Sequence, residues 1–274
     1  MPEGDSYVQA AARIRPVLEG QTVTRAGGVP QVRRHAGRVV GATAVGVRTV
    51  GKHLLIDLST AWTIHVWLGM PGRVRVSAGR RSTALGESRR RERHDQGAIR
   101  LLLETDAGRV EVWSAPTVEI ERTRVIEDRL DRLGPDILVH PFDWSRFESL
   151  VVKADAGRRI GDILLDQRLV SGIGNVYRNE VLFCEGVHPL TPLAALPSDR
   201  LADIVRRAIR LMRANTRGGP RVTTGNAGQP AWVYDRAGLP CRRCGQAIQA
   251  AHVGSPPRIT YWCPGCQVPE RGSR

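Results

Sequence analysis

The chain has almost no lysine and no long apolar segment. Only Lys52 and Lys153 are lysines among its 41 basic residues. No apolar run approaches the roughly 18 residues of a membrane-spanning helix, which excludes helical membrane proteins. The first residues, MPEGD, are acidic and lack the apolar stretch of a secretory signal. We therefore expect a chain that neither enters a membrane nor is secreted.

Acidic residues are few relative to basic ones. The 274 residues carry 41 Lys and Arg against 27 Asp and Glu, a formal net charge of +14. This excess indicates a polyanionic partner, nucleic acid before membrane. A preference for arginine codons would explain the ratio of Arg to Lys, but not the excess over acids. Six arginines lie in the segment 79–93, which has no periodicity and is predicted to be an exposed loop, either solvated or in contact with DNA.

Cysteine is scarce, and its spacing is informative. Cys241-x-x-Cys244 and Cys263-x-x-Cys266 are separated by eighteen residues, a spacing within the range of zinc ribbons. Four thiolates fill the tetrahedral coordination of Zn²⁺ and leave no position for water, so we expect one structural zinc ion per chain. Disulfides or a chance spacing are the alternatives. Cys184 lies in an apolar context and is interpreted as a buried thiol, not a nucleophile.

The first half of the chain predicts one helix followed by strands. Residues 5–19 have helical periodicity, with Asp5 or Ser6 as the cap and Pro16 as a residue that ends or kinks the helix. Residues 38–114 alternate between apolar and polar side chains, the pattern of a β-sandwich or barrel. The alternating apolar residues are Leu54, Ile56, Leu58, Val74, Val76, Val110 and Val112.

The second half predicts helices. Residues 198–216 place five apolar side chains on one helical face, with Ser198 or Asp199 as the cap. These side chains are Leu201, Ile204, Val205, Ala208 and Met212. Residues 217–230 are rich in glycine and are predicted to form a loop. The length of the chain suggests two domains.

The amino-terminus offers a candidate nucleophile. Met1 is normally removed before proline, which would expose the secondary amine of Pro2 beside the carboxyl of Glu3. An α-amino group has a pKa near 8 against about 10.4 for lysine, so roughly a tenth of it is free base at pH 7. Its attack on the aldehyde carbon of a sugar, with loss of water, gives an iminium ion, an electron sink for β-elimination. The alternative is an ordinary frayed terminus.

The segment SGIGNVYRNEVL at 171–182 predicts a helix that starts near Asn175. Gly172 and Gly174 allow a tight entry, and the unpaired amides and dipole of a helix amino-terminus suit a phosphate. The Asn175 side chain can add a donor. A turn that serves only packing is the alternative.

Five segments occur in a particular order along the chain. They are MPEG at the start, GKHLLIDL at 51–58, GMPGRVRV at 69–76, LLDQRLVSGIGNVYRNEVLF at 164–183, and PCRRCG with RITYWCPGCQ at 240–267. Together they resemble the formamidopyrimidine-DNA glycosylase and endonuclease VIII family of base-excision repair enzymes. The resemblance covers nearly the whole chain.

The resemblance implies an α+β multidomain fold with DNA in a cleft. Its parts would be an N-terminal β-sandwich catalytic domain at 1–132, a helix–two-turn–helix DNA-binding domain at 133–230 and a C-terminal zinc ribbon at 231–274. It further implies a monomer of the bacterial cytoplasm, associated with the nucleoid. Its partner would be damaged DNA, double-stranded, and not a membrane.

The resemblance also implies roles for particular residues. Pro2 corresponds to the nucleophile that forms a Schiff base, and Glu3 to the neighbouring general acid/base. Lys52 corresponds to the essential lysine that contacts phosphate near the damaged nucleotide, with a solvated surface lysine as the alternative. Asn175 and Arg258 correspond to residues that grip phosphate from the helix–two-turn–helix element and from the ribbon hairpin.

One further residue corresponds to the family's wedge. Met70 would fill the space that a flipped-out nucleotide vacates, with a methionine packed on the sheet as the alternative. The chain departs from the family pattern nearby, because Trp67 stands where many members have histidine. Ser6 stands where many members have glutamate, and Asp5 could replace that acid.

The expected class of lesion depends on a motif that the chain lacks. Residues 110–122 contain no Arg-x-Phe, which the guanine-directed branch inserts opposite the estranged base, and the string YWCPGC resembles endonuclease VIII. We therefore expect a bifunctional DNA glycosylase and AP lyase of the endonuclease VIII-like branch, which removes oxidised pyrimidines by β/δ-elimination. The alternatives are a sibling directed at 8-oxoguanine and formamidopyrimidine, or a non-catalytic zinc-ribbon protein that binds nucleic acid.

Overall fold

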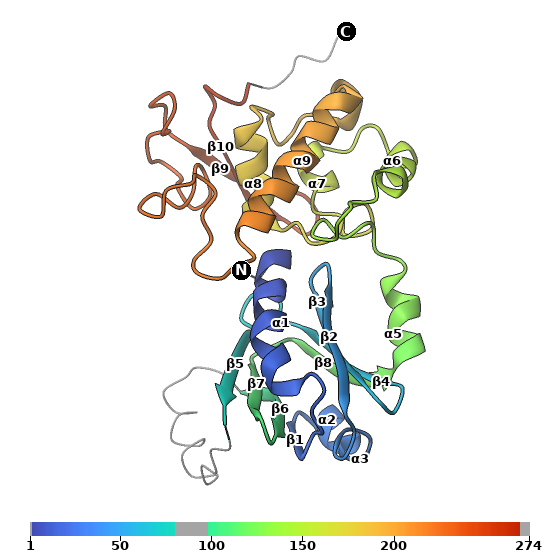
Figure 1. The fold of residues 1–274 in the computed structure, drawn as a ribbon. Helices are drawn as coiled ribbons and strands as arrows, with labels where there is room; N and C mark the ends of the chain where they lie inside the picture. The colour runs from blue at the N-terminus through green and yellow to red at the C-terminus, as the bar shows by residue number, and fades with distance from the viewer. Residues whose placement is uncertain (1, 80–97, 269–274) are drawn as a thin grey trace. The chain divides into compact units, whose positions relative to one another are not determined.

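The computed structural model describes residues 2–79 and 98–268, and the chain divides into two compact units (Figure 1). Unit 1 holds the residues up to Arg132, except for Glu3–Asp5. Unit 2 holds Glu3–Asp5 and the residues from Leu133 onwards. The predicted basic loop at 79–93 lies outside the described residues from position 80. Within the described residues, no helix has both the length and the apolar composition to cross a membrane.

Unit 1 contains two antiparallel four-stranded sheets around one hydrophobic core, which confirms the predicted β-sandwich. One sheet has the order β1-β6-β7-β5 and the other the order β2-β3-β4-β8. The strands are β1 (Arg25–Gly28), β2 (Ala44–Val50), β3 (His53–Leu58), β4 (Trp62–Trp67), β5 (Arg73–Ala78), β6 (Ile99–Thr105), β7 (Gly108–Trp113) and β8 (Thr117–Arg122). The helices are α1 (Gly4–Leu18), α2 (Pro30–Arg34), α3 (Ala36–Val39) and α5 (Thr123–Leu130).

The period-two segments are strands, with two differences from the prediction. In β3 the alternation of Leu54, Ile56 and Leu58 would place Leu55 on the outward face, but Leu55 is fully buried like its neighbours, so both faces of this sheet are covered there. The sheet also continues past residue 114, because β8 buries Val118 and Ile120 and alternates them with two glutamates. The prediction stopped one strand too early.

Helix α1 begins at Gly4, so Asp5 lies in its first turn and is not its cap. Pro16 lies inside the helix, which continues to Leu18. A proline so close to the end removes one main-chain hydrogen bond and breaks nothing further along. The apolar face of the helix, including Tyr7 and Ile14, is buried in the core of unit 1.

Unit 2 is helical and ends in a two-stranded hairpin. Its elements are α6 (Trp144–Val152), α7 (Ile160–Ile163), α8 (Asn175–Cys184), the 3₁₀ helix η1 (Leu193–Ala195), α9 (Ser198–Ala214), β9 (Gln249–Val253) and β10 (Arg258–Trp262). The five predicted apolar side chains of α9 are all buried. Its cap is Pro197, with no side-chain hydrogen bond. Ser198 and Asp199 therefore lie inside the helix, contrary to the prediction.

Helix α8 is buried from its first residue to Phe183. The predicted loop at 217–230 contains neither helix nor strand. Just after it, the chain is held by the fully buried carboxylate of Glu180, which accepts main-chain N–H bonds from Trp232, Val233 and Tyr234 at 2.8, 2.9 and 2.8 Å. These three hydrogen bonds replace the solvation that the carboxylate loses when it is buried.

Candidate active site and metal centre

The carboxylate of Glu3 is bound at the amino-terminus of α8. Glu3 is fully buried, and its oxygens accept the main-chain N–H groups of Gly174 at 2.8 Å, Val176 at 2.7 Å and Tyr177 at 3.4 Å. A helix amino-terminus leaves such amides unpaired and favours a negative charge. The anion at these amides is therefore Glu3, whereas the sequence suggested a phosphate there.

The absence of a side chain at Gly174 makes this contact possible. A Cβ atom at Gly174 would lie 2.4 Å from the carboxyl carbon of Glu3 and 2.5 Å from its Cγ. The chain also turns sharply just before the helix, where Gly172 has a φ of 104°, a value that favours glycine. The two glycines predicted as a tight entry thus bring Glu3 against the helix.

Pro2 precedes Glu3 directly and is half-buried. It belongs to unit 1, whereas Glu3 belongs to unit 2. The peptide bond between them keeps the nitrogen of Pro2 next to the anchored Glu3, and removal of Met1 would make this nitrogen a secondary amine. A secondary amine beside a carboxylate is a pair that can form a covalent adduct and transfer protons.

The carboxylate of Asp5 is hydrogen-bonded to two other side chains. Its two oxygens accept from Arg221 at 2.6 and 2.8 Å, and Oδ2 also accepts from the hydroxyl of Tyr177 at 2.8 Å. The Asp5 side chain is only 2% exposed. A carboxylate held in this way is not presented to a substrate, which argues against Asp5 as a replacement acid.

Lys52 lies in the turn between β2 and β3 of unit 1 and is half-buried. It is followed by a chain of polar side chains that sequence reasoning missed. His53 Nδ1 lies 2.7 Å from His65 Nε2, and His65 Nδ1 lies 2.7 Å from Glu119 Oε1. Burial, followed by the neighbouring His65, lowers the pKa of His53 to about 4, so His53 is neutral at pH 7 beside the lysine.

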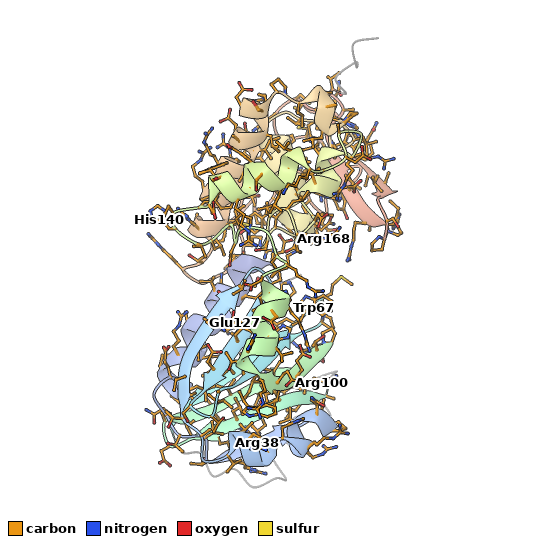
Figure 2. The ribbon with its side chains drawn as sticks, turned by 90° about the vertical axis from the view of Figure 1, so that its right-hand side faces the viewer. Arg38, Trp67, Arg100, Glu127, His140 and Arg168 are labelled. Carbon is orange, nitrogen blue, oxygen red and sulfur yellow. The ribbon has the colours of Figure 1, made fainter. Side chains whose placement is uncertain are left out.

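Met70 protrudes from the turn between β4 and β5. Its side chain is 63% exposed, and Trp67 at the end of β4 is 40% exposed (Figure 2). The turn requires glycine at position 69, where φ is 57°, and a Cβ at Gly72 would lie 2.2 Å from the carbonyl oxygen of Leu68. Met70 is therefore not packed on the sheet, and two large apolar side chains are exposed at one end of β4.

Asn175 and its neighbours on α8 hold strand β10. The Asn175 side-chain amide donates to the carbonyl of Ile259 at 2.9 Å. The fully buried Arg178 donates to the same carbonyl at 3.2 Å and to the hydroxyl of Thr260 at 2.8 Å. Together these bonds fix the strand whose first residue is Arg258.

Arg258 is exposed and lines a cavity of about 430 Å³. Arg158 and Arg168 (labelled in Figure 2) line the same cavity. Both of these arginines are paired with Asp166 at 3.1 Å. Sequence reasoning did not find these two residues, because no motif marked them and only the fold of unit 2 brings them to the hairpin.

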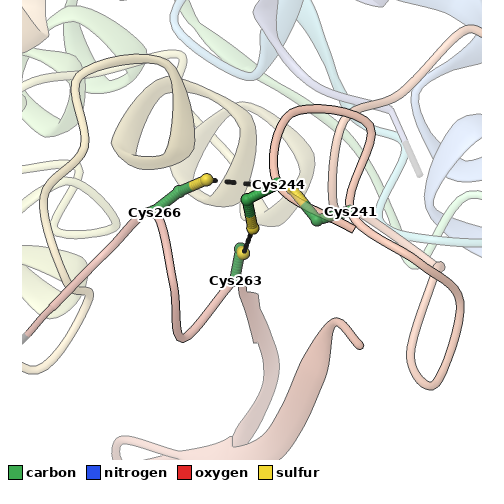
Figure 3. A group of neighbouring side chains, drawn as sticks. All are labelled: Cys241, Cys244, Cys263 and Cys266. Atoms are coloured by element: carbon green, nitrogen blue, oxygen red, sulfur yellow. Dashed lines mark hydrogen bonds between the residues drawn. The ribbon is translucent and has the colours of Figure 1, made fainter. Parts of the chain in front are cut away.

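The four predicted metal ligands lie together. The Sγ atoms of Cys241, Cys244, Cys263 and Cys266 are all within 4.8 Å of one another, and Figure 3 shows the two pairs joined across the cluster. Cys241 lies 3.8 Å from Cys266, and Cys244 lies 3.3 Å from Cys263. A tetrahedral ion with metal–sulfur bonds of about 2.3 Å would separate its ligands by about 3.8 Å. The cluster fits one tetrahedral metal ion.

Cys184 is separate from this cluster and is not a candidate nucleophile. Burial raises the pKa of its thiol to about 11. The uncharged thiol is a poor nucleophile, as the sequence indicated, although Cys184 is half-buried and not fully buried. It provides a control cysteine for experiments on the metal site.

Comparison with known proteins agrees with this geometry. The family model for the formamidopyrimidine-DNA glycosylase N-terminal domain matches residues 1–113, and the model for the formamidopyrimidine-DNA glycosylase H2TH domain matches residues 133–225. Two curated relatives are each 38% identical to the chain. They are the "Probable endonuclease 8 2" of Streptomyces coelicolor, matched over 100% of this chain and 98% of the relative, and the "DNA-(apurinic or apyrimidinic site) lyase Nei2" of Mycolicibacterium smegmatis, over 98% and 99%.

One further relative and one solved structure have lower sequence identity to this chain. A formamidopyrimidine-DNA glycosylase of Rhodopseudomonas palustris is 32% identical over 97% of this chain and all of its own length. The Fpg (MutM) of Lactococcus lactis, solved with DNA that contains an oxidised pyrimidine, superposes with a TM-score of 0.78 at 22% identity. That match covers 97% of this chain and 100% of the other and establishes a shared fold.

Proposed function

The chain belongs to the formamidopyrimidine-DNA glycosylase and endonuclease VIII family, on its endonuclease VIII-like branch, and we propose that it is a DNA glycosylase with AP lyase activity in base-excision repair. The observation that carries the proposal is the Pro2–Glu3 segment, whose carboxylate is anchored by three main-chain amides at the amino-terminus of α8, those of Gly174, Val176 and Tyr177. A protein that only binds DNA needs no anchored acid next to a terminal amine.

The proposed reaction begins with the amine of Pro2. It attacks C1′ of the damaged nucleotide, the bond from C1′ to the base breaks, and Glu3 assists the proton transfers as the sugar ring opens. The product is an iminium ion between Pro2 and C1′, which makes the C2′ proton acidic. Loss of that proton expels the 3′ phosphate, and a second elimination expels the 5′ phosphate. A one-nucleotide gap remains.

Oxidised pyrimidines are the proposed lesions. The connection between β7 and β8 is only three residues long, Ser114 to Pro116. Its central residue, Ala115, is buried. This short turn offers neither an arginine nor a phenylalanine to insert opposite the estranged base, as a guanine-directed enzyme would. The relatives at 38% identity carry endonuclease 8 or AP lyase names.

Four remaining site residues take supporting roles in this proposal. Lys52, Asn175 and Arg258 contact phosphates of the damaged strand, and the exposed Met70 enters the duplex where the nucleotide has left. We propose that the ion in the four-cysteine cluster is Zn²⁺, because thiolates in tetrahedral geometry favour it and an ion with four protein ligands has no open position for catalysis.

Borohydride trapping tests the proposed reaction. Borohydride added to the protein with a duplex that contains an abasic site is expected to reduce the iminium ion and leave a covalent complex, with the adduct on residue 2 by peptide mapping. A protein that retains Met1 should bind the duplex but give no complex. Equal trapping with a blocked terminus would place the nucleophile elsewhere, with Lys52 the next candidate.

A panel of duplexes tests the lesion class. Thymine glycol and 5-hydroxycytosine should be excised faster than 8-oxoguanine at equal enzyme concentration. The reverse order would identify the guanine-directed sibling. Trapping with no excision of any base would leave an AP lyase alone.

DNA binding is expected to depend steeply on salt, because the chain carries a net charge of +14. If about six phosphates are neutralised, log K falls against log salt with a slope near −5, so affinity drops about a thousandfold between 50 and 200 mM salt. Arg258→Ala should reduce the slope by about one unit. The control is Arg206→Ala, which removes the same charge from an ion pair with Asp203 on α9. Equal slopes for the two variants would contradict a phosphate contact at Arg258.

A further inference from the structure

Arg221 comes from the glycine-rich loop at 217–230, yet its side chain is only 17% exposed. Its Nε and one terminal nitrogen donate to the two oxygens of Asp5 at 2.8 and 2.6 Å. Such a two-point contact fixes both the distance and the plane of the carboxylate. The partners are 216 residues apart in the chain, so the contact fastens this loop to the amino-terminal segment.

Tyr177 joins this ion pair to the anchored Glu3. Its hydroxyl donates to Asp5 at 2.8 Å, and its main-chain N–H faces Glu3 at 3.4 Å. The guanidinium carbon of Arg221 lies 4.9 Å from the centroid of the Tyr177 ring. Arg221 also lies 4.0 Å from Glu3 Oε1. The side chains of Arg221 and Tyr177 therefore both bond Asp5, and Arg221 also lies beside the anchored Glu3.

The chain between the two carboxylates needs such a restraint. Gly4 alone separates Glu3 from Asp5, and glycine gains the most backbone freedom when a segment loosens. An amine that must meet a sugar carbon loses about a hundredfold in rate when it is misplaced by about 1 Å. The ion pair of Arg221 and Asp5 is mostly shielded from water. Charge-assisted hydrogen bonds are stronger in such an environment than in water.

We infer that Arg221 is a positioning residue of the proposed glycosylase, which clamps Asp5 and thereby holds Pro2 and Glu3 in place for the attack on the sugar. The inference rests on the proposed function. Arg221 itself touches neither DNA nor the reacting atoms in this role. It acts through Asp5, whose carboxylate serves as its anchor and takes no part in proton transfer.

An arginine in a DNA-binding protein could instead contact phosphate. Such a contact adds to the salt dependence of binding, and its loss lowers affinity. The clamp makes the opposite prediction, because a guanidinium paired with Asp5 has its charge already neutralised. Rate and affinity therefore separate the two roles.

The test compares Arg221→Ala with Arg207→Ala. Arg207 also donates to a carboxylate, that of Glu185 at 2.6 Å, but on α9 and away from the amino-terminal segment. With saturating enzyme on a lesion duplex, Arg221→Ala is expected to slow base excision and borohydride trapping by about a hundredfold. Its DNA affinity and salt slope should equal those of the wild type. Arg207→Ala should match the wild type in all of these measurements.

Hydrogen exchange gives a reading that does not depend on activity. In Arg221→Ala the main-chain amides of Gly174, Val176 and Tyr177 should exchange faster, because Glu3 is held less firmly against them. In Arg207→Ala they should not. If the wild type excised nothing while Arg221→Ala still accelerated this exchange, the proposed function would be wrong and the clamp would stand.

Arg221→Lys serves where the alanine variant does not fold. It keeps the charge but not the two-point contact, so its excision rate should lie between those of the wild type and Arg221→Ala, at unchanged affinity. Unchanged excision and exchange in either Arg221 variant would overturn the inference. So would a loss of affinity with a flatter salt slope, since that result would make Arg221 a phosphate contact.

Discussion

Replacing Gly174 with alanine is expected to slow base excision by at least about a hundredfold, a far larger change than in DNA affinity. The backbone of Gly174 is not the reason, because its φ of −124° and ψ of −164° suit alanine. The reason is the added Cβ, which would lie 2.4 to 2.7 Å from three atoms of the Glu3 side chain. Glu3 must move off the helix amino-terminus, and Pro2 is attached to it.

Single-turnover rates on two substrates measure this effect. Excision of a damaged base needs the proton transfers that Glu3 assists, a contribution of about a hundredfold to ten-thousandfold. A preformed abasic site has no base to lose, so its cleavage should suffer less. Gly37→Ala is the control, since a Cβ at this helical glycine meets nothing within 4 Å, and it should behave as wild type.

A double variant shows whether the effect passes through Glu3. In a Glu3→Ala background, Gly174→Ala should add little to the loss of base excision, because the Glu3 side-chain atoms that the new Cβ would meet have already been removed. Independent, multiplying losses would mean that Gly174 acts on another part of the site. Thermal unfolding of Gly174→Ala should be measured alongside the kinetics, because a clash in a packed interior lowers the free energy of unfolding by about 1–3 kcal/mol.

Local patterns in the sequence predicted local structure well. The five apolar residues of α9 follow from helical spacing alone, and the clustering of the four cysteines follows from the spacing of their two Cys-x-x-Cys pairs. The start of α8 at Asn175 follows from the two glycines before it. In each case the residues that determine the structure are close together in the chain or are fixed by one ligand.

Contacts between distant segments could not be read in the same way. Glu3 lies 171 residues from Gly174, so nothing in the segment SGIGN indicated that a side chain of the protein would fill the helix amino-terminus. The pair of His53 and His65 exists because β3 and β4 run antiparallel, and only the register of the strands brings the two rings together. The proposed catalytic pair, Pro2 and Glu3, follows from family resemblance, since a Met-Pro-Glu start alone is a weak signal.

Replacing Cys244 with serine is expected to remove the metal and unfold the ribbon. In its described residues, up to position 268, the ribbon contributes five buried side chains to a small core that also contains Phe183 of α8. Its one two-stranded hairpin is at best marginally stable on its own. A structural zinc ion contributes about 10–16 kcal/mol of apparent binding free energy in small ribbons, and that energy is available for folding. Without the ion, the hairpin of β9 and β10 loses the constraint that fixes Cys263 and the residues before it.

The consequence for DNA follows from the position of Arg258 on that hairpin. Cys244→Ser should reduce DNA affinity at least as much as Arg258→Ala, which removes one charged contact worth about tenfold or more, and should flatten the salt dependence similarly. Unit 1 has its own hydrophobic core and should stay folded. Cys184→Ser should keep the metal, because Cys184 lies outside the four-cysteine cluster.

Metal analysis decides the outcome. Purified wild type and Cys184→Ser should each contain one zinc ion per chain, and Cys244→Ser none. Prolonged treatment of the wild type with a chelator should reproduce the loss of affinity, and added Zn²⁺ should reverse it. A folded, active protein without zinc would show that the ribbon is held by its own packing, in which case the Cys244 variant would weaken DNA binding no more than the Cys184 control.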